Sequence, residues 1–353
     1  MAYRAERVAL PTAEADVVRL WRENLSFGFD PALKYRWFYS ESPCGSADVF
    51  LLLHEAGRDT RAVGCAGLGR RRLWHRGTPL SASLPADLAV DRAHRLLAPA
   101  LMLQRAVREH ATRTSQLCYA FPNSHAAPVM ERAGYKRLGR FRRYVRPLDA
   151  GSLADARAAA GVVPWLLRRG VARAARVAAG LRRPVRTILG RRFRWLEDID
   201  PGFERLWRAR QAESPFVGDR TARFLRWRFL ERPGVPSRLV AAYDRAGHPT
   251  AYAFLTAKEA GAAFLADFAF SAPLELGILL DFISRELRRE GLVRIETHFL
   301  GPHRLQRLLV TRGFLPHGTG KWVVVSAGAN APVTEEEALR PEDWFLTDAD
   351  RDN

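Results

Sequence analysis

The segment FPNSHAAPVMERAGYKRLG at residues 121–139 places an asparagine and a glycine-aromatic pair at fixed distances after an apolar run. Asn123 is followed by Gly134 and Tyr135 eleven and twelve places later. An asparagine after a strand is a common helix N-cap, because its side-chain oxygen accepts hydrogen bonds from the free N–H groups of the first turn. A glycine commonly ends a helix. The spacing predicts a helix that begins just after Asn123 and ends before Gly134.

Histidine and cysteine offer fewer candidates for chemistry. Three histidines near loops could act as bases, but each stands alone in the sequence: His75, His94 and His125. Three cysteines are odd in number and far apart: Cys44, Cys65 and Cys118. This pattern fits reduced thiols in a cytoplasm better than a disulfide framework, and its spacing does not fit a metal site. We therefore predict no metal ligands.

The stretch GCAGLG at residues 64–69 superficially resembles a dinucleotide-binding fingerprint. Its glycine spacing is wrong, and three arginines, a leucine and a tryptophan follow it instead of a helix that could hold a phosphate. We interpret this stretch as a strand whose small residues face a neighbouring element.

Composition bounds the class of protein. The 353 residues, 47% of them hydrophobic, are enough for two domains. No stretch approaches the ~20 apolar residues of a transmembrane helix, so we expect a soluble or peripheral protein, and the reduced thiols favour the cytoplasm. The net charge is +18, and residues 151–195 contribute +10 of it. This basic segment also contains Trp165, and we expect either a linker that packs its apolar side on the domains or peripheral contact with an anionic membrane through 160–195.

Hydrophobic periodicity predicts a mixed α/β layer. Helical patterns cover 12–25, 31–40, 99–111 and 124–133, and strand patterns cover 62–69, 83–90, 115–121 and 136–148. Pro99 suits the first turn of its helix.

The chain also resembles itself at an offset of about 180 to 190 residues. YRWFYSESP at 35–43 matches LRWRFLERP at 225–233, ADLAV at 86–90 matches ADFAF at 266–270, and ERAGYKRLG at 131–139 matches VTRGFLPHG at 310–318. Three matches in the same order predict two copies of one fold. We place them at 1–148 and 195–326, with an arginine-rich helical linker at 149–194 and an acidic tail at 327–353 that could lie against the basic surface.

Between a predicted strand and a predicted helix, the run Arg95-Leu96-Leu97-Ala98-Pro99-Ala100 resembles the phosphate-binding signature of the GNAT superfamily of acyl-CoA N-acyltransferases. In that signature the backbone N–H groups of a helix N-terminus approach the pyrophosphate of coenzyme A. Ala98 replaces the central glycine, and Pro99 lacks an N–H group. The Asn123 segment resembles the later GNAT motif. The resemblance implies an α/β fold with two GNAT-like domains, each a mixed central sheet flanked by helices, joined by a basic helical insert.

The resemblance also implies a function: transfer of an acetyl or other acyl group from acyl-CoA to a small-molecule amine or sugar-amine. It assigns the binding of acyl-CoA to the end of the strand before the loop, to the loop and to the later motif: Leu88, Val90, Arg95, Leu96, Leu97, Ala98, Ala100 and Asn123. It assigns catalysis to Asp87 as a general base. Many GNAT enzymes have a tyrosine that acts as general acid where this chain has Met130. Tyr135 is therefore a candidate acid, and Tyr119 is another.

The second copy has SAPLELG at 271–277 in place of the phosphate loop, and Glu275 would repel a pyrophosphate. We therefore expect a degenerate second copy that completes the substrate cleft. Two alternatives stay open. A Fem-like aminoacyl transferase would take its acyl group from charged tRNA and would use the arginines to bind the phosphate backbone. A catalytically silent GNAT-fold binding protein would explain the missing glycines.

Overall fold

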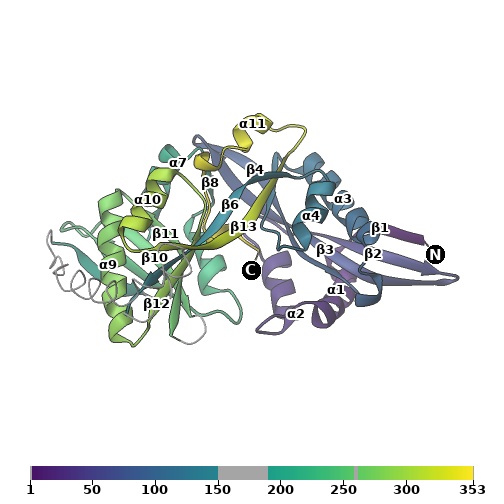
Figure 1. Cartoon of the computed structure of the whole chain (residues 1–353), viewed down its shortest axis with the longest axis horizontal. Helices are drawn as coiled ribbons and strands as arrows, with labels where there is room; N and C mark the ends of the chain where they lie inside the picture. Colours follow the sequence, from purple (N-terminus) through teal and green to yellow (C-terminus); the bar gives the residue numbers. More distant parts are fainter. Residues whose placement is uncertain (1, 150–189, 258–260, 353) are drawn as a thin grey trace, which may run out of the picture.

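The computed structural model describes residues 2–149, 190–257 and 261–352, and the predicted basic helical insert falls almost entirely outside them. The described residues form one 14-stranded mixed sheet with helices on its faces (Figure 1). The predicted mixed α/β class is confirmed.

The first half contains every helix and strand that the periodicity predicted. Its elements are β1 (Ala2–Val8), α1 (Leu10–Asn24), α2 (Pro31–Lys34), the π-helix η1 (Tyr35–Ser40), β2 (Asp48–Ala56), β3 (Asp59–His75), β4 (Thr78–Val90), the short 3-10 helix η2 (Arg92–His94), α3 (Leu97–Thr114), β5 (Leu117–Ala120), α4 (Ala126–Arg132) and β6 (Lys136–Pro147). Strand β1 was not predicted, since it lies at the sheet edge and most of its residues are exposed.

The second half has a similar order of elements, with the additional strand β8 (Phe216–Gly218) and, among its described residues, without a counterpart of η2. It contains β7 (Arg192–Leu196), α7 (Phe203–Glu213), β8 (Phe216–Gly218), α8 (Ala222–Leu225), the π-helix η4 (Arg226–Leu230), β9 (Ser237–Tyr243), β10 (Pro249–Ala257), β11 (Ala262–Phe270), α9 (Pro273–Arg289), β12 (Arg294–Phe299), α10 (His303–Thr311) and β13 (Leu315–Ala327). After it come α11 (Glu335–Ala338), η5 (Pro341–Asp343), β14 (Trp344–Phe345) and η6 (Asp348–Asp350). The matched sequences at 35–43 and 225–233 both contain a π-helix.

The two halves exchange their last strands. The strand order is β1-β2-β3-β4-β5-β13 in one direction and β7-β9-β10-β11-β12-β6 in the other, and β13 pairs with β6 in the middle. Figure 1 shows β6 and β13 crossing between the two groups of helices. Each half of the sheet is therefore completed by a strand from the other half of the chain, and the two halves share one sheet. The domain boundaries at residues 148 and 195 remain predictions.

The glycines of GCAGLG are explained by packing. A Cβ atom on Gly67 would lie 2.0 Å from the hydroxyl of Tyr39, and one on Gly69 would lie 2.8 Å from the ring of Phe38. The π-helix η1 therefore packs directly on the backbone of β3. This confirms the interpretation of GCAGLG as a strand with small residues facing a neighbour.

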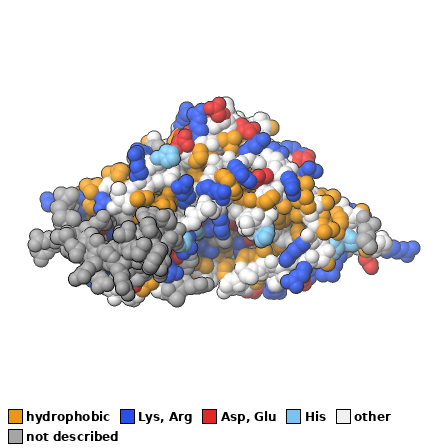
Figure 2. Space-filling view, viewed as in Figure 1, with side chains coloured by type: hydrophobic (Ala, Val, Ile, Leu, Met, Phe, Trp, Pro, Cys, Tyr) orange, Lys and Arg blue, Asp and Glu red, His pale blue; other side chains and the backbone are white. Residues whose placement is uncertain are grey.

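Separate hydrophobic cores cover the two faces of the first half. One contains Trp21 and Tyr39 and lies under α1 and η1, whereas the other contains Leu103 and Met130 and lies under α3 and α4. Within the described residues no helix is long and apolar enough to cross a membrane. Figure 2 shows basic side chains over both halves of one face, with hydrophobic side chains between them.

Candidate functional site

Two parallel strands of the first half, β4 and β5, separate part-way along, and we call the place where their pairing ends the strand gap. β4 and β5 pair only at Ala82–Leu117 and Ser83–Cys118. β4 then continues to Val90, and no described strand pairs with this edge beyond Ser83. The backbone N–H and C=O groups along such an edge can hydrogen-bond an extended ligand that carries amides.

At the end of β4 lies the N-terminus of α3. The N-cap residue Leu96 has an extended backbone, and no side chain caps the helix. Leu97, Ala98 and Pro99 are the first three helical residues, as expected for Pro99. The N–H groups of Leu97, Ala98 and Ala100 belong to the first turn, whose partial positive charge attracts an anion. Ala98 is small and exposed, so it does not block the approach of a phosphate.

Arg95 fixes the loop between β4 and α3. Its Nε donates a hydrogen bond to the backbone oxygen of Val90 at 2.9 Å, and its Nη2 donates to Oδ1 of Asn24 at 2.8 Å. The side chains of Leu88 and Val90 pack into the core under α3, so only their backbone groups can line the edge of β4. Arg95 therefore links the end of β4 to helix α1 while its side chain stays largely exposed.

Asn123 lies in the loop between β5 and α4, and its side chain holds the turn that leads into α4. Its Oδ1 accepts hydrogen bonds from the backbone N–H groups of His125 at 3.0 Å and Ala126 at 2.9 Å. Gly134 follows the helix with a φ of 102°, which favours glycine, and leads into β6. The predicted helix between Asn123 and Gly134 is confirmed. Asn123 follows β5 and the start of α3 follows β4, and these are the two strands on either side of the strand gap.

Asp87 lies at a bulge in the free part of β4. The register between β3 and β4 shifts between Cys65 and Gly67, opposite the residues around Asp87. Asp87 itself has a φ of 52°, in the left-handed region that non-glycine residues adopt rarely and aspartate more readily than most. The bulge turns this carboxylate out of the regular alternation of the strand.

The Asp87 carboxylate has two partners that the sequence did not reveal. Nζ of Lys34 lies 2.5 Å from Oδ1, and the hydroxyl of Tyr39 donates to Oδ2 at 3.1 Å. The side chains of Lys34 and Asp87 are only 3% and 6% exposed. Burial raises the pKa of Asp87 above its ordinary value, and the Lys34 cation opposes this rise. The carboxylate is thus buried, paired and oriented on both oxygens.

The structure does not bring Tyr135 or Tyr119 to Asp87. The hydroxyl of Tyr135 contacts Sγ of Cys118 at 3.8 Å in the core under α3 and α4, whereas Tyr39, the partner of Asp87, lies in the core of the other face. Burial raises the pKa of Tyr135 well above its ordinary value. Tyr119 is buried against Phe121 and Trp344. Met130 is also a core residue.

In the second half, a later segment of the chain contacts the corresponding place where two parallel strands separate. β11 and β12 pair from Ala262–Arg294 to Leu265–Thr297 and then separate. Leu346 exchanges backbone hydrogen bonds with Leu300, just after β12, at 2.9 and 3.2 Å. The ring of Phe345 contacts the rings of two phenylalanines on these strands, Phe268 and Phe299. We call residues 344–350 the closing segment.

The closing segment also covers the counterpart of Asp87. Asp267 lies at a register shift of β11, and its Oδ1 accepts a hydrogen bond from the hydroxyl of Thr347. Arg220 donates to both oxygens of Asp267 and to Asp350. All four side chains are buried. The expectation that the acidic tail lies against the basic insert concerns residues outside the described part of the chain, but residues near the end of the tail are buried in the fold.

The start of α9, which corresponds to the start of α3, carries an acid. Glu275 lies in the first turn and forms two hydrogen bonds with Arg191, at 2.9 and 2.5 Å. Neither helix start has a side-chain cap, but the first turn of α9 contains this carboxylate, whereas the first turn of α3 contains no acid.

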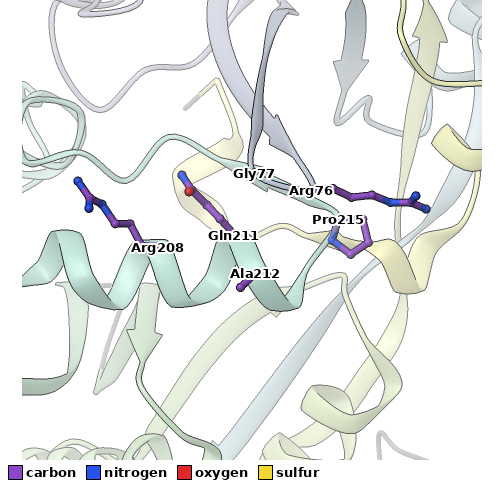
Figure 3. A pocket seen from close by; sticks show the side chains of 6 residues that line it. All are labelled: Arg76, Gly77, Arg208, Gln211, Ala212 and Pro215. Carbon is purple, nitrogen blue, oxygen red and sulfur yellow. The ribbon is translucent and has the colours of Figure 1, made fainter.

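A pocket of about 440 Å³ lies elsewhere, between the β3–β4 turn and helix α7 (Figure 3). It is lined by Arg76, Gly77, Arg208, Gln211, Ala212 and Pro215. Arg76 and Arg208 already pair with Glu337 and Glu204, and none of the predicted site residues lines this pocket.

The three cysteines, all in the described part of the chain, are free thiols. Burial raises the pKa of Cys118 to about 11, so this thiol is a poor nucleophile at neutral pH. The described residues contain no group of histidine, cysteine or acidic side chains that could hold a metal ion.

Comparison with solved structures identifies the fold. A probable N-acyltransferase from Enterococcus faecalis, a conserved protein of unknown function, is 13% identical over 93% of this chain and 73% of that chain, with a TM-score of 0.65. A GCN5-related N-acetyltransferase from Anabaena variabilis is 12% identical over 92% and 72%, with a TM-score of 0.63. Saccharomyces cerevisiae N-myristoyltransferase with bound myristoyl-CoA is 15% identical over 95% and 81%, with a TM-score of 0.56.

No protein-family model matches the sequence, and no curated protein matches it. The structural matches span nearly the whole chain, so the predicted GNAT-like fold is confirmed.

Proposed function

We propose that this protein is an acyltransferase that moves an acetyl or other acyl group from acyl-CoA to a small-molecule amine or sugar-amine. The observation that carries the proposal is the unpaired edge of β4 beyond Ser83, with the uncapped N-terminus of α3 at its end. An acyl-CoA molecule combines an extended, amide-bearing arm with a pyrophosphate. The edge of β4 suits the arm and the start of α3 suits the pyrophosphate.

Asp87 is the general base in this proposal. It takes a proton from the acceptor amine, the amine nitrogen forms a bond to the thioester carbonyl carbon, and the carbon–sulfur bond breaks to release coenzyme A as a thiolate. Burial supports this role, because a carboxylate whose pKa is raised toward neutral pH is a stronger base. Tyr135 is left out of the mechanism, since its hydroxyl is engaged with Cys118 in a separate core.

A single acyl-CoA site per chain forms part of the proposal. The second half has a similar order of elements, and we interpret it as a degenerate copy of the first. The closing segment contacts its separating strands, and its helix start carries the Glu275–Arg191 pair. Both features oppose the binding of a second anionic ligand.

Calorimetric titration of the full chain with acetyl-CoA tests the proposal, together with Arg95→Glu. This substitution removes both hydrogen bonds of Arg95 and places a negative charge beside the start of α3. The matched control is Arg113→Glu, because Arg113 is exposed in the last turn of the same helix and the charge change is equal. We expect Arg95→Glu to abolish binding and Arg113→Glu to retain it. Unchanged affinity in Arg95→Glu would contradict the assignment of the loop.

A further inference from the structure

Lys34 is unusual among the basic residues of this chain. Only four of its 56 basic residues are lysines, and Lys34 is 2% exposed. Lysine is almost never fully buried unless it is paired. Its Nζ lies near the rings of three aromatic residues, 4.7 Å from the centroid of Phe27 and 5.8 Å from those of Trp21 and Phe38. Within this aromatic surround its ion-pair partner is Asp87.

The second half shows what an arginine does to the corresponding acid. Nε of Arg220 donates to both oxygens of Asp267 at 3.1 Å, and the Tyr252 hydroxyl contacts Oδ2 at 3.2 Å. Asp267 therefore accepts from three side chains, because Thr347 also donates to its Oδ1. Asp87 has two side-chain donors: Lys34 contacts only Oδ1, and the Tyr39 hydroxyl contacts Oδ2. Fewer donors leave more lone pairs of the Asp87 carboxylate available to accept a proton.

We propose that Lys34 is a positioning residue of the acyl-transfer site, which holds the Asp87 carboxylate ionised and oriented through one oxygen while leaving it able to accept a proton. The role of Lys34 in catalysis rests on the proposed function, but its effect on Asp87 does not. Without this cation, Asp87 would be a buried carboxylate with only a tyrosine hydroxyl as partner, and it would take up a proton.

Other groups also act on this carboxylate. Tyr39 donates to it from η1, and Asp352, near the end of the chain, raises its pKa. Asp87 in turn raises the pKa of Cys65 on β3, after the larger effect of burial. Lys34 is the only cation among these four groups. Its removal should therefore raise the pKa of Asp87, and none of the other three groups can reverse the direction of this shift.

The test is the titration of Asp87, followed by carbon NMR of its side-chain carboxyl group in the intact protein. We expect the midpoint in Lys34→Met to lie about 1–3 pH units above that of the wild type, the usual effect of losing an adjacent opposite charge. The control is Lys136→Met, because Lys136 is exposed at the start of β6 and its loss removes the same charge. An unchanged midpoint in folded Lys34→Met would overturn the proposal.

A second measurement needs no substitution at Lys34. With four lysines in the chain, nitrogen-labelled lysine gives few ammonium signals, and that of the buried Lys34 should exchange slowly with water. We expect this signal to shift at the pH at which Asp87 titrates and to lose that shift in Asp87→Asn. A Lys34 ammonium signal that does not shift when Asp87 titrates would overturn the proposal, even if Lys34→Met does not fold. Neither measurement uses coenzyme A, so failure here is distinct from failure of acyl-CoA binding.

Discussion

Trp37 and Trp227 donate their indole N–H groups to each other's backbone carbonyl oxygens, at 2.9 and 3.0 Å. Their rings stack with centroids 4.9 Å apart. The two residues occupy matched places in the sequence repeat, one in η1 and the other in η4. A reciprocal contact of this kind arises when two similar segments pack face to face, and here it joins the two halves of the chain at their centre.

Trp37→Phe should destabilise the protein by about 1–3 kcal/mol, because the buried carbonyl oxygen of Trp227 loses its donor while the ring is kept. Urea unfolding of both single variants and of the double variant with Trp227→Phe should give a coupling energy of about 0.5–3 kcal/mol. Trp195→Phe is the control, because Trp195 is partly exposed, and its cost should stay below about 1 kcal/mol. Additive effects of the two central substitutions would contradict the reciprocal contact.

Arg220→Met should cost about 3–5 kcal/mol of unfolding free energy, because Asp267 and Asp350 would remain buried without their cation. Arg226→Met is the matched control, since Arg226 forms an exposed pair with Asp198 and its loss should cost about 0–1 kcal/mol.

The deficit of Arg220→Met should also depend on pH. The pKa of Asp267 is already raised, by burial first, and Arg220 limits the rise. Loss of Arg220 raises this pKa further above the unfolded value. The folded variant therefore binds protons more readily than its unfolded chain, and the deficit should shrink as the pH falls. A deficit that grows toward acid would be inconsistent with this account.

Gly67→Ala tests the packing of η1 on β3. The new Cβ would lie 2.0 Å from the Tyr39 hydroxyl, so Tyr39 must move away from Asp87. We expect a loss of about 1–3 kcal/mol in urea unfolding, as for other overpacked core sites. Gly28→Ala should change stability by less than about 0.5 kcal/mol, because nothing lies within 4 Å of its new Cβ. Equal stability of the two variants would show that η1 is free to shift.

Asp87→Asn should lower kcat about 100-fold or more with little change in acetyl-CoA affinity, since an amide cannot take the proton of the acceptor amine. Thiol release with an amine found in an acceptor screen measures the rate, and calorimetry measures the affinity. Asp59→Asn, a substitution at the exposed start of β3, should leave both unchanged. Near-normal turnover in folded Asp87→Asn would remove this residue from the mechanism.

The sequence predicted local structure better than pairing between distant segments. Apolar periodicity located β4, α3 and α4, and Asn123 and Gly134 marked the ends of a helix through their local chemistry. Strand β1 was missed because an edge strand with Arg4, Glu6 and Arg7 lacks a continuous apolar pattern. The exchange of β6 and β13 was also missed, since strand partners are chosen by contacts between residues far apart in the chain.

The candidate site was predicted only in part, because some of its residues are brought together by contacts between distant segments of the chain. Asp87 and the loop at Arg95 lie next to each other in sequence, but Lys34 reaches Asp87 across 53 residues. The only signal for Lys34 was the rarity of lysine in an arginine-rich chain. The acidic composition of the last residues suggested a surface tail, whereas Asp350 is buried because Arg220 lies beside it. Tyr135 was proposed as an acid from its position in a motif, which does not specify the face of the sheet that receives its side chain.

The central claim is that the unpaired edge of β4 and the start of α3 bind acyl-CoA and that the corresponding region of the second half does not. Calorimetric titration of the full chain with acetyl-CoA tests it most directly, with Glu275→Gln as a variant that removes the acid from the second helix start. We predict one bound molecule per chain in the wild type and in Glu275→Gln, and none in Arg95→Glu. Two bound molecules per wild-type chain, or no binding at all, would contradict the account.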